Sequence, residues 1–135
     1  MEKVFHAQLL TPDGAKFEGD AVSVQIPGSL GQFQVLYNHA PLVSSLGLGE
    51  ISITQKDGTE LHFAVNGGFV EISNNLCTLL AEKAELAEEI DMAETTKLRN
   101  ELKQKLQTLR HNREETELEL AIVENKLKIA SFKTR

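Results

Sequence analysis

The pattern of this sequence changes at residues Leu80–Asp91, which read LAEKAELAEEID. Before this stretch, apolar residues alternate with polar ones and turn-forming pairs recur every few residues. After it there is no glycine or proline, and apolar residues recur three or four positions apart. These two periods are typical of strands and helices respectively. The stretch therefore predicts a β unit that ends near Leu80 and a helical unit that starts near Asp91.

Chain size limits what each unit can do. The chain has 135 residues and is 41% hydrophobic, which fits one ordinary domain or a small domain with an appendage. A β unit of about 85 residues can bury a modest core and fold alone. A two-helix segment of about 45 residues is marginal by itself. We therefore expect the helical tail to rest on another surface.

Charge is distributed unevenly along the chain. Residues 1–88 carry 11 acidic and 4 basic side chains, so their net charge is −7, whereas residues 89–135 carry 9 acidic and 10 basic ones, for a net charge of +1. An acidic β unit would repel phosphates, which argues against nucleic-acid binding. The tail is highly charged but balanced, as on a solvated helix face.

Several other classes are disfavoured by simple features. Cys77 is the only cysteine and lies in an apolar run, so we expect a buried, inert thiol and no internal disulfide. The N-terminal residues lack the basic and apolar regions of a secretion signal. No run of about 18 apolar residues occurs, so we expect no membrane insertion. The interpretation is a cytosolic protein that can still sit on a membrane complex.

Alternation predicts eight to ten short strands in the first 85 residues. It is clear at Val22–Ile26, Phe33–Tyr37 and Leu61–Val65, and Pro12-Asp13-Gly14 is a strong turn signal. The connections are too short for the crossovers that parallel strands need. The expected fold class is therefore β plus α: an antiparallel β-sandwich or flattened barrel (1–85), followed by two helices (90–135).

The tail carries helix-start signals and apolar stripes. Asp91 and Glu94 have the spacing of a capping box, and Asn112 and Glu115 repeat it. An antiparallel hairpin is favoured over one unbroken helix, although no glycine or proline enforces the bend. The expected stripes comprise Leu98, Leu102, Leu106 and Leu109 in the first helix, and in the second Leu118, Ile122 and Ile129 beside Leu120, Val123, Leu127 and Ala130.

No catalytic or metal-binding constellation is found, and no cofactor is implied. His6, His62 and His111 lie far apart, and none has the spacing of a metal-ligand pair. No serine lies in a nucleophile elbow, and Gly47-Leu48-Gly49 precedes a strand rather than a helix.

The segment Pro27–Val43 leaves two readings open: a pair of ordinary β connections, or a recognition loop on a rigid sandwich.

An ordered set of motifs resembles the epsilon subunit of bacterial F-type ATP synthase over the whole chain. Each motif alone is weak, but their order is specific. The motifs are Thr11–Gly14, Phe17–Gly19, Pro27-Gly28, Phe33–Leu36, His39-Ala40-Pro41-Leu42, Val65–Ile72, Leu79–Glu82 and Glu89–Asp91.

The resemblance implies a non-catalytic rotor subunit. In that family the sandwich lies at the foot of the central stalk, held by the gamma subunit and touching the ring of c subunits. The helical tail can fold down or extend toward the alpha and beta subunits, and the extended form blocks ATP hydrolysis. The implied location is the cytoplasmic side of the bacterial cell membrane, as a peripheral part of the complex.

The resemblance also implies site residues. The expected interface with gamma or the c-ring comprises Gly31, Phe33, Tyr37, His39, Pro41 and Leu42. Basic residues that could meet acidic surfaces of the catalytic subunits are Arg99, Lys103, Lys105, Arg110, Arg113, Lys126 and Lys128, although a solvated helix face explains each of them singly.

Nucleotide binding by the tail is not expected. Relatives that bind ATP carry Ile-Asp-x-x-Arg-Ala at this junction; here Ile90 and Asp91 match, but Glu94 and Thr95 replace Arg-Ala. In the second helix, Ile122 and Lys126 stand where those relatives have two arginines. Losing positive charge and gaining Glu94 should together repel a triphosphate. The alternative function is a free-standing adaptor, in which the sandwich binds one partner and the helices form a coiled coil with another.

Overall fold

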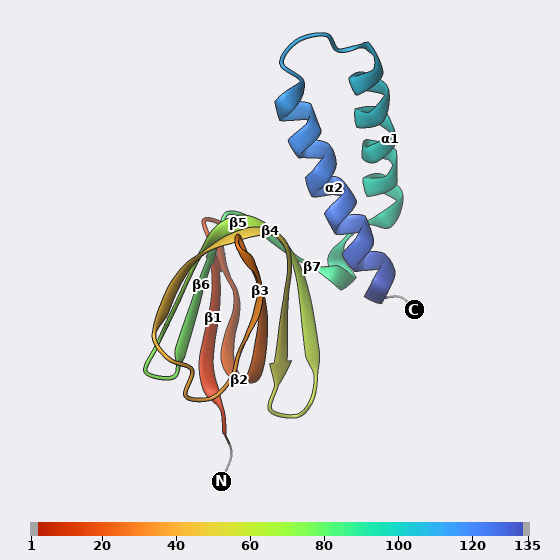
Figure 1. Cartoon of the computed structure of the whole chain (residues 1–135). Helices are drawn as coiled ribbons and strands as arrows, with labels where there is room; N and C mark the ends of the chain where they lie inside the picture. Colours follow the sequence, from red (N-terminus) through yellow and green to blue (C-terminus); the bar gives the residue numbers. More distant parts are fainter. Residues whose placement is uncertain (1–2, 134–135) are drawn as a thin grey trace. The chain divides into compact units, whose positions relative to one another are not determined.

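The computed structural model describes residues 3–133, and the chain divides into two compact units, residues 1–86 and residues 87–135. The first unit holds every strand and the second holds the helices (Figure 1). The strands are β1 (Phe5–Thr11), β2 (Gly14–Gly28), β3 (Gly31–Val35), β4 (Leu42–Gln55), β5 (Glu60–Ser73), β6 (Leu76–Ala81) and β7 (Ala84–Leu86); the helices are the 3-10 turn η1 (Ala87–Glu89), α1 (Met92–Thr108) and α2 (Arg113–Lys133).

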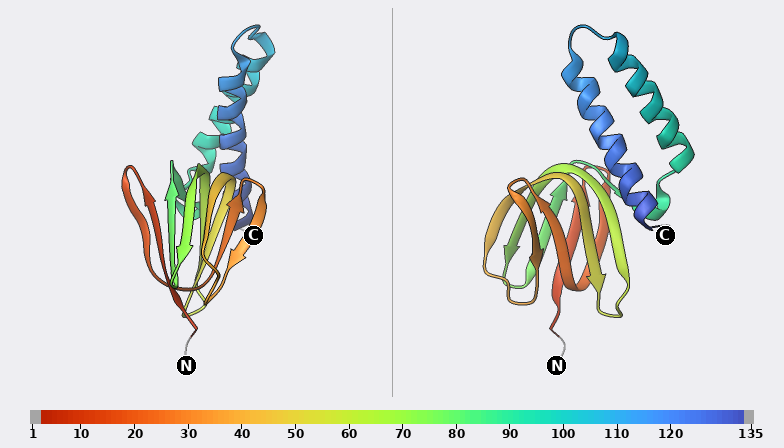
Figure 2. Two further views of the ribbon diagram at one scale, coloured as in Figure 1. Left: turned by 60° about the vertical axis from the view of Figure 1, so that its left-hand side comes forward. Right: turned by 45° about the vertical axis from the view of Figure 1, so that its right-hand side comes forward.

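The strands of the first unit pair around a closed circuit. Their order is β1-β6-β5-β4-β2-β3, β1 also pairs with β2, and β7 pairs with β5. This flattened barrel matches the expected class, but the described residues form seven strands rather than eight to ten. In addition, β1 and β6 pair in parallel, unlike the all-antiparallel sheet that was expected. The two views of Figure 2 show the strands wrapping around one interior.

The strand count was overestimated because β4 and β5 are long strands that bend without ending. Each has 14 residues, and they stay paired across the bend, with Leu46 opposite Gly68 and Leu48 opposite Asn66. The glycine pair Gly67-Gly68 reads in sequence as a break between two strands. In the structure both glycines have positive φ, and a Cβ on Gly68 would lie 1.9 Å from the Leu80 carbonyl oxygen. Only glycine fits this bend.

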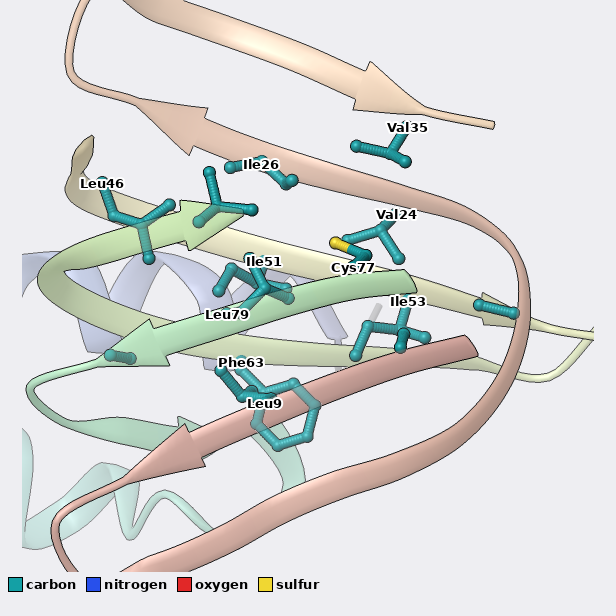
Figure 3. Close-up of a cluster of buried hydrophobic side chains, with 14 of the residues drawn as sticks. Leu9, Val24, Ile26, Val35, Leu46, Ile51, Ile53, Phe63, Cys77 and Leu79 are labelled. Carbon is teal, nitrogen blue, oxygen red and sulfur yellow. The ribbon is translucent and has the colours of Figure 1, made fainter. Parts of the chain in front are cut away.

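The core of the β unit is apolar and contiguous. Alternate residues of every long strand point into it, as Figure 3 shows for ten labelled side chains from Leu9 to Leu79. Leu9, Ile51, Ile53, Cys77 and Leu79 are fully shielded from solvent. Burial of this set supplies most of the favourable free energy of folding of this unit.

The helical unit is an antiparallel hairpin. α1 starts with Asp91 as N-cap, whose Oδ1 accepts a hydrogen bond from Glu94 N at 3.1 Å. Residues 109–112 separate the two helices, and Asn112 has a left-handed φ of 55°. Leu102 of α1 packs with Val123 and Leu127 of α2. The capping of α1 and the preference for a hairpin over one helix are thus confirmed.

Candidate functional site

One outer face of the β unit carries several exposed apolar side chains, with the charged and exposed Glu71 opposite Val43. Along the rows that run across β4, β5, β6 and β1, Phe69 is paired with Leu80 and with Ser45, and Leu80 is paired with Leu10. Phe69 is 60% exposed, and Val43, two residues before Ser45 on β4, is 70% exposed. Leu80 is also exposed. We refer to Val43, Phe69 and Leu80 as the apolar face.

The outward row on another part of the sheet is polar. Across β3, β2, β4 and β5, the paired residues are Gln34, Gln25, Ser52 and His62. Their neighbours Ile51, Ile53 and Phe63 point into the core, so this row points away from it. The outward row of Gln34, Gln25, Ser52 and His62 is therefore polar, whereas the other outward surface carries exposed apolar side chains. Contiguous exposed apolar surface of this kind marks contact sites.

Two connections add exposed apolar side chains. Leu30, at the tip of the hairpin between β2 and β3, is fully exposed. Leu36 and Tyr37, at the other end of β3, are exposed as well. The hairpin tip is fixed to β4 by a 3.1 Å hydrogen bond from Ser29 N to Ser45 O. These side chains are thus presented from ordered backbone.

The structure divides the six interface residues expected from sequence into three groups. Gly31 lies at the hairpin tip, whereas Tyr37, His39 and Pro41 lie in the connection beyond the other end of β3. Phe33 and Leu42 are partly buried and pack against the core. The six therefore do not form one surface. Those with side chains available for contact are Tyr37, Pro41 and, in part, His39.

Leu30 and Val43 lie in the segment Pro27–Val43 that was considered as a recognition loop, but neither was named as an interface residue, and the exposure of Phe69 and Leu80 was not expected. A signal was present, because Leu42-Val43, Phe69-Val70 and Leu79-Leu80 are apolar doublets within strands. In a strand with one face in water, alternation would make one member of each pair polar. Doublets on three neighbouring strands therefore indicate a sheet that is covered on both faces in its working state.

In the helical unit, several of the expected basic residues are engaged within the hairpin, and Arg99 donates to Asn100 Oδ1. Lys103 Nζ lies 4.0 Å from Glu124 Oε2, which links α1 to α2. Arg113 donates hydrogen bonds from Nη1 to the carbonyl oxygens of Leu106 and Leu109. Arg110 and Lys128 are exposed. Leu98 and Leu118 of the predicted stripes are exposed too, whereas Leu120 packs against the Val123 cluster.

The two residues of the partial nucleotide motif have structural roles. Ile90 is buried, and the Asp91 side chain caps α1. The Asp91 carbonyl oxygen also accepts hydrogen bonds from Thr95, through its backbone N at 3.0 Å and its Oγ1 at 2.6 Å. The Asp91 side chain and its carbonyl oxygen are therefore both hydrogen-bonded to residues in the first turn of α1.

Within the described residues, no group of three or more His, Cys, Asp or Glu side chains is arranged to hold a metal. His62 Nδ1 lies 2.5 Å from Glu50 Oε2 and 3.2 Å from Ser52 Oγ, on the polar outer surface. A shallow pocket is lined by Asp20, Gln55, Lys56 and Asp57.

Burial raises the pKa of the Cys77 thiol to about 12, so this thiol is not poised as a nucleophile.

No helix in residues 3–133 is both long enough and apolar enough to cross a bilayer. The fold and its surfaces define a class: a two-part protein in which a β barrel with exposed apolar side chains on one outer face is followed by a helical hairpin.

The chain belongs to the delta/epsilon chain family of ATP synthase. The family model for the delta/epsilon chain β-sandwich domain matches residues 4–87. The ATP synthase epsilon chain of Exiguobacterium sp. is 38% identical over 133 residues, which are 95% of this chain and 96% of that one. That of Nitratidesulfovibrio vulgaris is 36% identical over 126 residues, 90% and 93% of the two chains. The resemblance carried by the sequence motifs is confirmed.

Solved structures share the fold. A chain in the Euglena gracilis mitochondrial ATP synthase, in a structure of OSCP, F1 and c-ring, superposes with a TM-score of 0.84 at 21% identity, covering 98% of this chain and 83% of that one. A chain in the central stalk and c-ring structure from Tetrahymena thermophila gives a TM-score of 0.59 at 14% identity, covering 96% and 97%.

Proposed function

We propose that this chain is a non-catalytic subunit of the rotor of an F-type ATP synthase, which joins gamma to the c-ring. Membership of the epsilon family supports this proposal. The observation that carries it is the apolar face of Val43, Phe69 and Leu80, because three exposed apolar side chains on adjacent strands need a permanent partner. A freely diffusing protein would expose this surface to water.

The apolar face is assigned to gamma. A long-lived partner inside one rotor calls for a surface that resembles a core, and apolar side chains supply it. The connection with Leu36 and Tyr37 leads directly into β4, the strand of Val43, so it belongs to the same contact. Pro41 and His39 lie in that connection.

The hairpin tip with Leu30 and Gly31 is assigned to the c-ring. It lies at the other end of β3 from Tyr37, and its Ser29 is bonded to Ser45 opposite Phe69, so the c-ring contact would border the gamma contact. With the c-ring in the bilayer, the β unit would be a peripheral membrane component on the cytoplasmic side.

The helical hairpin is assigned a regulatory role. It would extend along gamma toward alpha and beta and block hydrolysis there. In that state Arg99, Lys103, Arg110, Arg113, Lys126 and Lys128 would face acidic surfaces. The contacts of Lys103 and Arg113 within the hairpin then compete with the extended form.

The experiment is a binding measurement with F1 purified without this subunit. Phe69→Ser should weaken binding at least tenfold, because burial of a phenylalanine side chain is worth about 1.5–3 kcal/mol. The matched control is Gln25→Ala, on the polar outer row, which should bind like the wild type. If the wild-type chain does not bind F1 and instead forms a soluble oligomer through its helices, the adaptor function replaces this proposal.

A further inference from the structure

Two asparagines that are 37 positions apart in sequence are hydrogen-bonded to each other at one end of the β unit. Asn38 N donates a 2.7 Å hydrogen bond to Asn75 Oδ1, and Asn75 Nδ2 donates a 3.0 Å hydrogen bond to Asn38 Oδ1. Asn38 lies in the connection between β3 and β4, and Asn75 in the turn between β5 and β6. The pair therefore joins two segments that lie just beyond Leu42 and Ile72, the last paired residues at this end of β4 and β5.

Both residues adopt a backbone conformation that most residues avoid. The φ angles are 62° at Asn38 and 58° at Asn75, in the left-handed region. Asparagine tolerates this region better than other non-glycine residues. The two bonds engage Oδ1 and Nδ2 of the Asn75 side chain, and the backbone N and side-chain Oδ1 of Asn38.

Asn75 is itself anchored in the sheet. Its carbonyl oxygen accepts a 3.0 Å hydrogen bond from His6 N, at the start of the parallel pairing of β1 with β6. The bonds of the other segment are otherwise local: His39 N donates to Leu36 O at 3.1 Å, and His39 Nδ1 lies 2.7 Å from Ala40 O. Between its two strand ends, the connection is thus linked by the asparagine pair to a turn that is anchored in the sheet.

The residues next to the pair are exposed and apolar. Leu36 and Tyr37 precede Asn38, and Leu76 follows Asn75. We infer that Asn38 and Asn75 are positioning residues for docking to gamma: they hold Leu36 and Tyr37 in place before the partner arrives. This inference rests on the proposed function, because it deepens the assignment of the same contact.

The physical reason is preorganisation. A connection that must be ordered on binding lowers affinity, since side chains and backbone lose conformational freedom at that step. A connection ordered beforehand does not carry this cost. The partner contacts neither amide in this scheme, so the effect of the pair on binding is indirect.

The test uses glycine substitutions, because glycine keeps the left-handed backbone. Asn75→Gly removes both hydrogen bonds, whereas Asn38→Gly keeps the Asn38 N donor and removes only one. We expect Asn75→Gly to weaken binding to F1 lacking this subunit by about tenfold, Asn38→Gly by about threefold, and the double variant by no more than Asn75→Gly.

The matched control is Asn74→Gly. Asn74 also has a left-handed φ, of 52°, and lies in the same turn, but no bond joins it to the connection. It should bind like the wild type. Hydrogen exchange of the Asn38 backbone N–H should accelerate in Asn75→Gly and stay slow in Asn74→Gly. This exchange rate reports directly on the order of the connection between β3 and β4.

The outcomes separate this inference from the proposed function. Loss of binding by Phe69→Ser together with wild-type binding by Asn75→Gly, at accelerated exchange of the Asn38 amide, overturns the positioning role and leaves docking intact. Equal weakening by Asn74→Gly overturns it as well, because the turn backbone is then responsible. If Asn75→Gly fails to fold, Asn38→Gly decides, and wild-type affinity for that variant counts against the inference.

Discussion

Arg113 caps the preceding helix through its side chain: Nη1 donates a 2.8 Å hydrogen bond to the carbonyl oxygen of Leu109, and a 2.5 Å bond to that of Leu106. In an unbroken helix these carbonyls would instead accept from the backbone N–H groups of Arg113 and Arg110. The same acceptors are therefore satisfied in both the bent and the straight form. This exchange removes the hydrogen-bonding difference at these two carbonyls, so the balance between the two forms depends on the packing of Leu102 with Val123 and Leu127 and on contacts made by the straight form.

Arg113→Met should shift the tail toward the straight form, because only the bent form loses a donor. The side chain is 44% exposed, so we expect about 1 kcal/mol, or about a fivefold change in the ratio of the two forms. Spin labels at Lys97 and Lys128, in a Cys77→Ala background, would lie about 46 Å apart along one straight helix. The long-distance population should grow in the variant. Arg110→Met serves as the control, and an equal response there would contradict the capping role.

The Cys77 thiol should resist alkylation in the native protein. Burial raises its pKa to about 12, so almost no thiolate forms near neutral pH. Because the folded pKa lies above the unfolded one, this contribution to stability is present below about pH 9 and is lost as pH rises toward 12. Labelling by a disulfide reagent should follow urea unfolding. Rapid labelling of fully folded protein at pH 7 would contradict the burial.

The acid limit of stability should depend on Glu18. Its side chain accepts a hydrogen bond from Gln8 Nε2 and lies beside His6, both at 3.2 Å, and these partners lower the pKa of the carboxyl group. A lowered folded pKa means that the stabilisation is present above the ordinary glutamate range and disappears as pH falls through the folded value. Glu18→Gln should therefore lower the midpoint of thermal unfolding at pH 7 and leave it nearly unchanged at pH 3. Parallel curves for the two proteins would count against this prediction.

The order of units, the fold class and the capping of α1 could be predicted because they depend on local pattern. Strand number could not, since whether Gly67-Gly68 ends a strand or bends it is decided by the pairing of Gly68 with Ala81. The parallel pairing of β1 with β6 joins residues about 70 positions apart, and no local signal encodes it.

Exposure of the expected interface residues could be predicted only in part, for a related reason. Phe33 and Tyr37 look alike in sequence as aromatic residues in an alternating run, yet Phe33 packs on the core and Tyr37 is exposed. Their difference depends on where β3 ends. The Asn38–Asn75 pair depends on two turns meeting in space, which the pattern of a single sequence does not reveal.

ATP should bind the isolated chain weakly or not at all. Asp91 is engaged in capping α1, and Glu94 adds negative charge one turn into the helix. Calorimetric titration with ATP should show no affinity tighter than millimolar. The paired variant Glu94→Arg with Thr95→Ala, which restores the sequence of ATP-binding relatives at this junction, should bind more tightly than the wild type. Submillimolar affinity of the wild-type chain would contradict the prediction.

Removal of the helical unit should raise ATP hydrolysis by the assembled F1 complex. A chain that ends after Glu89 keeps all seven strands and the apolar face, so it should still join gamma. Without α1 and α2 nothing can extend toward the catalytic subunits, and hydrolysis should rise severalfold at unchanged assembly. Arg113→Met supplies the opposite control: if it favours the straight form, the full-length variant should hydrolyse ATP more slowly than the wild type. Unchanged rates in both variants would make the tail a clamp rather than a brake.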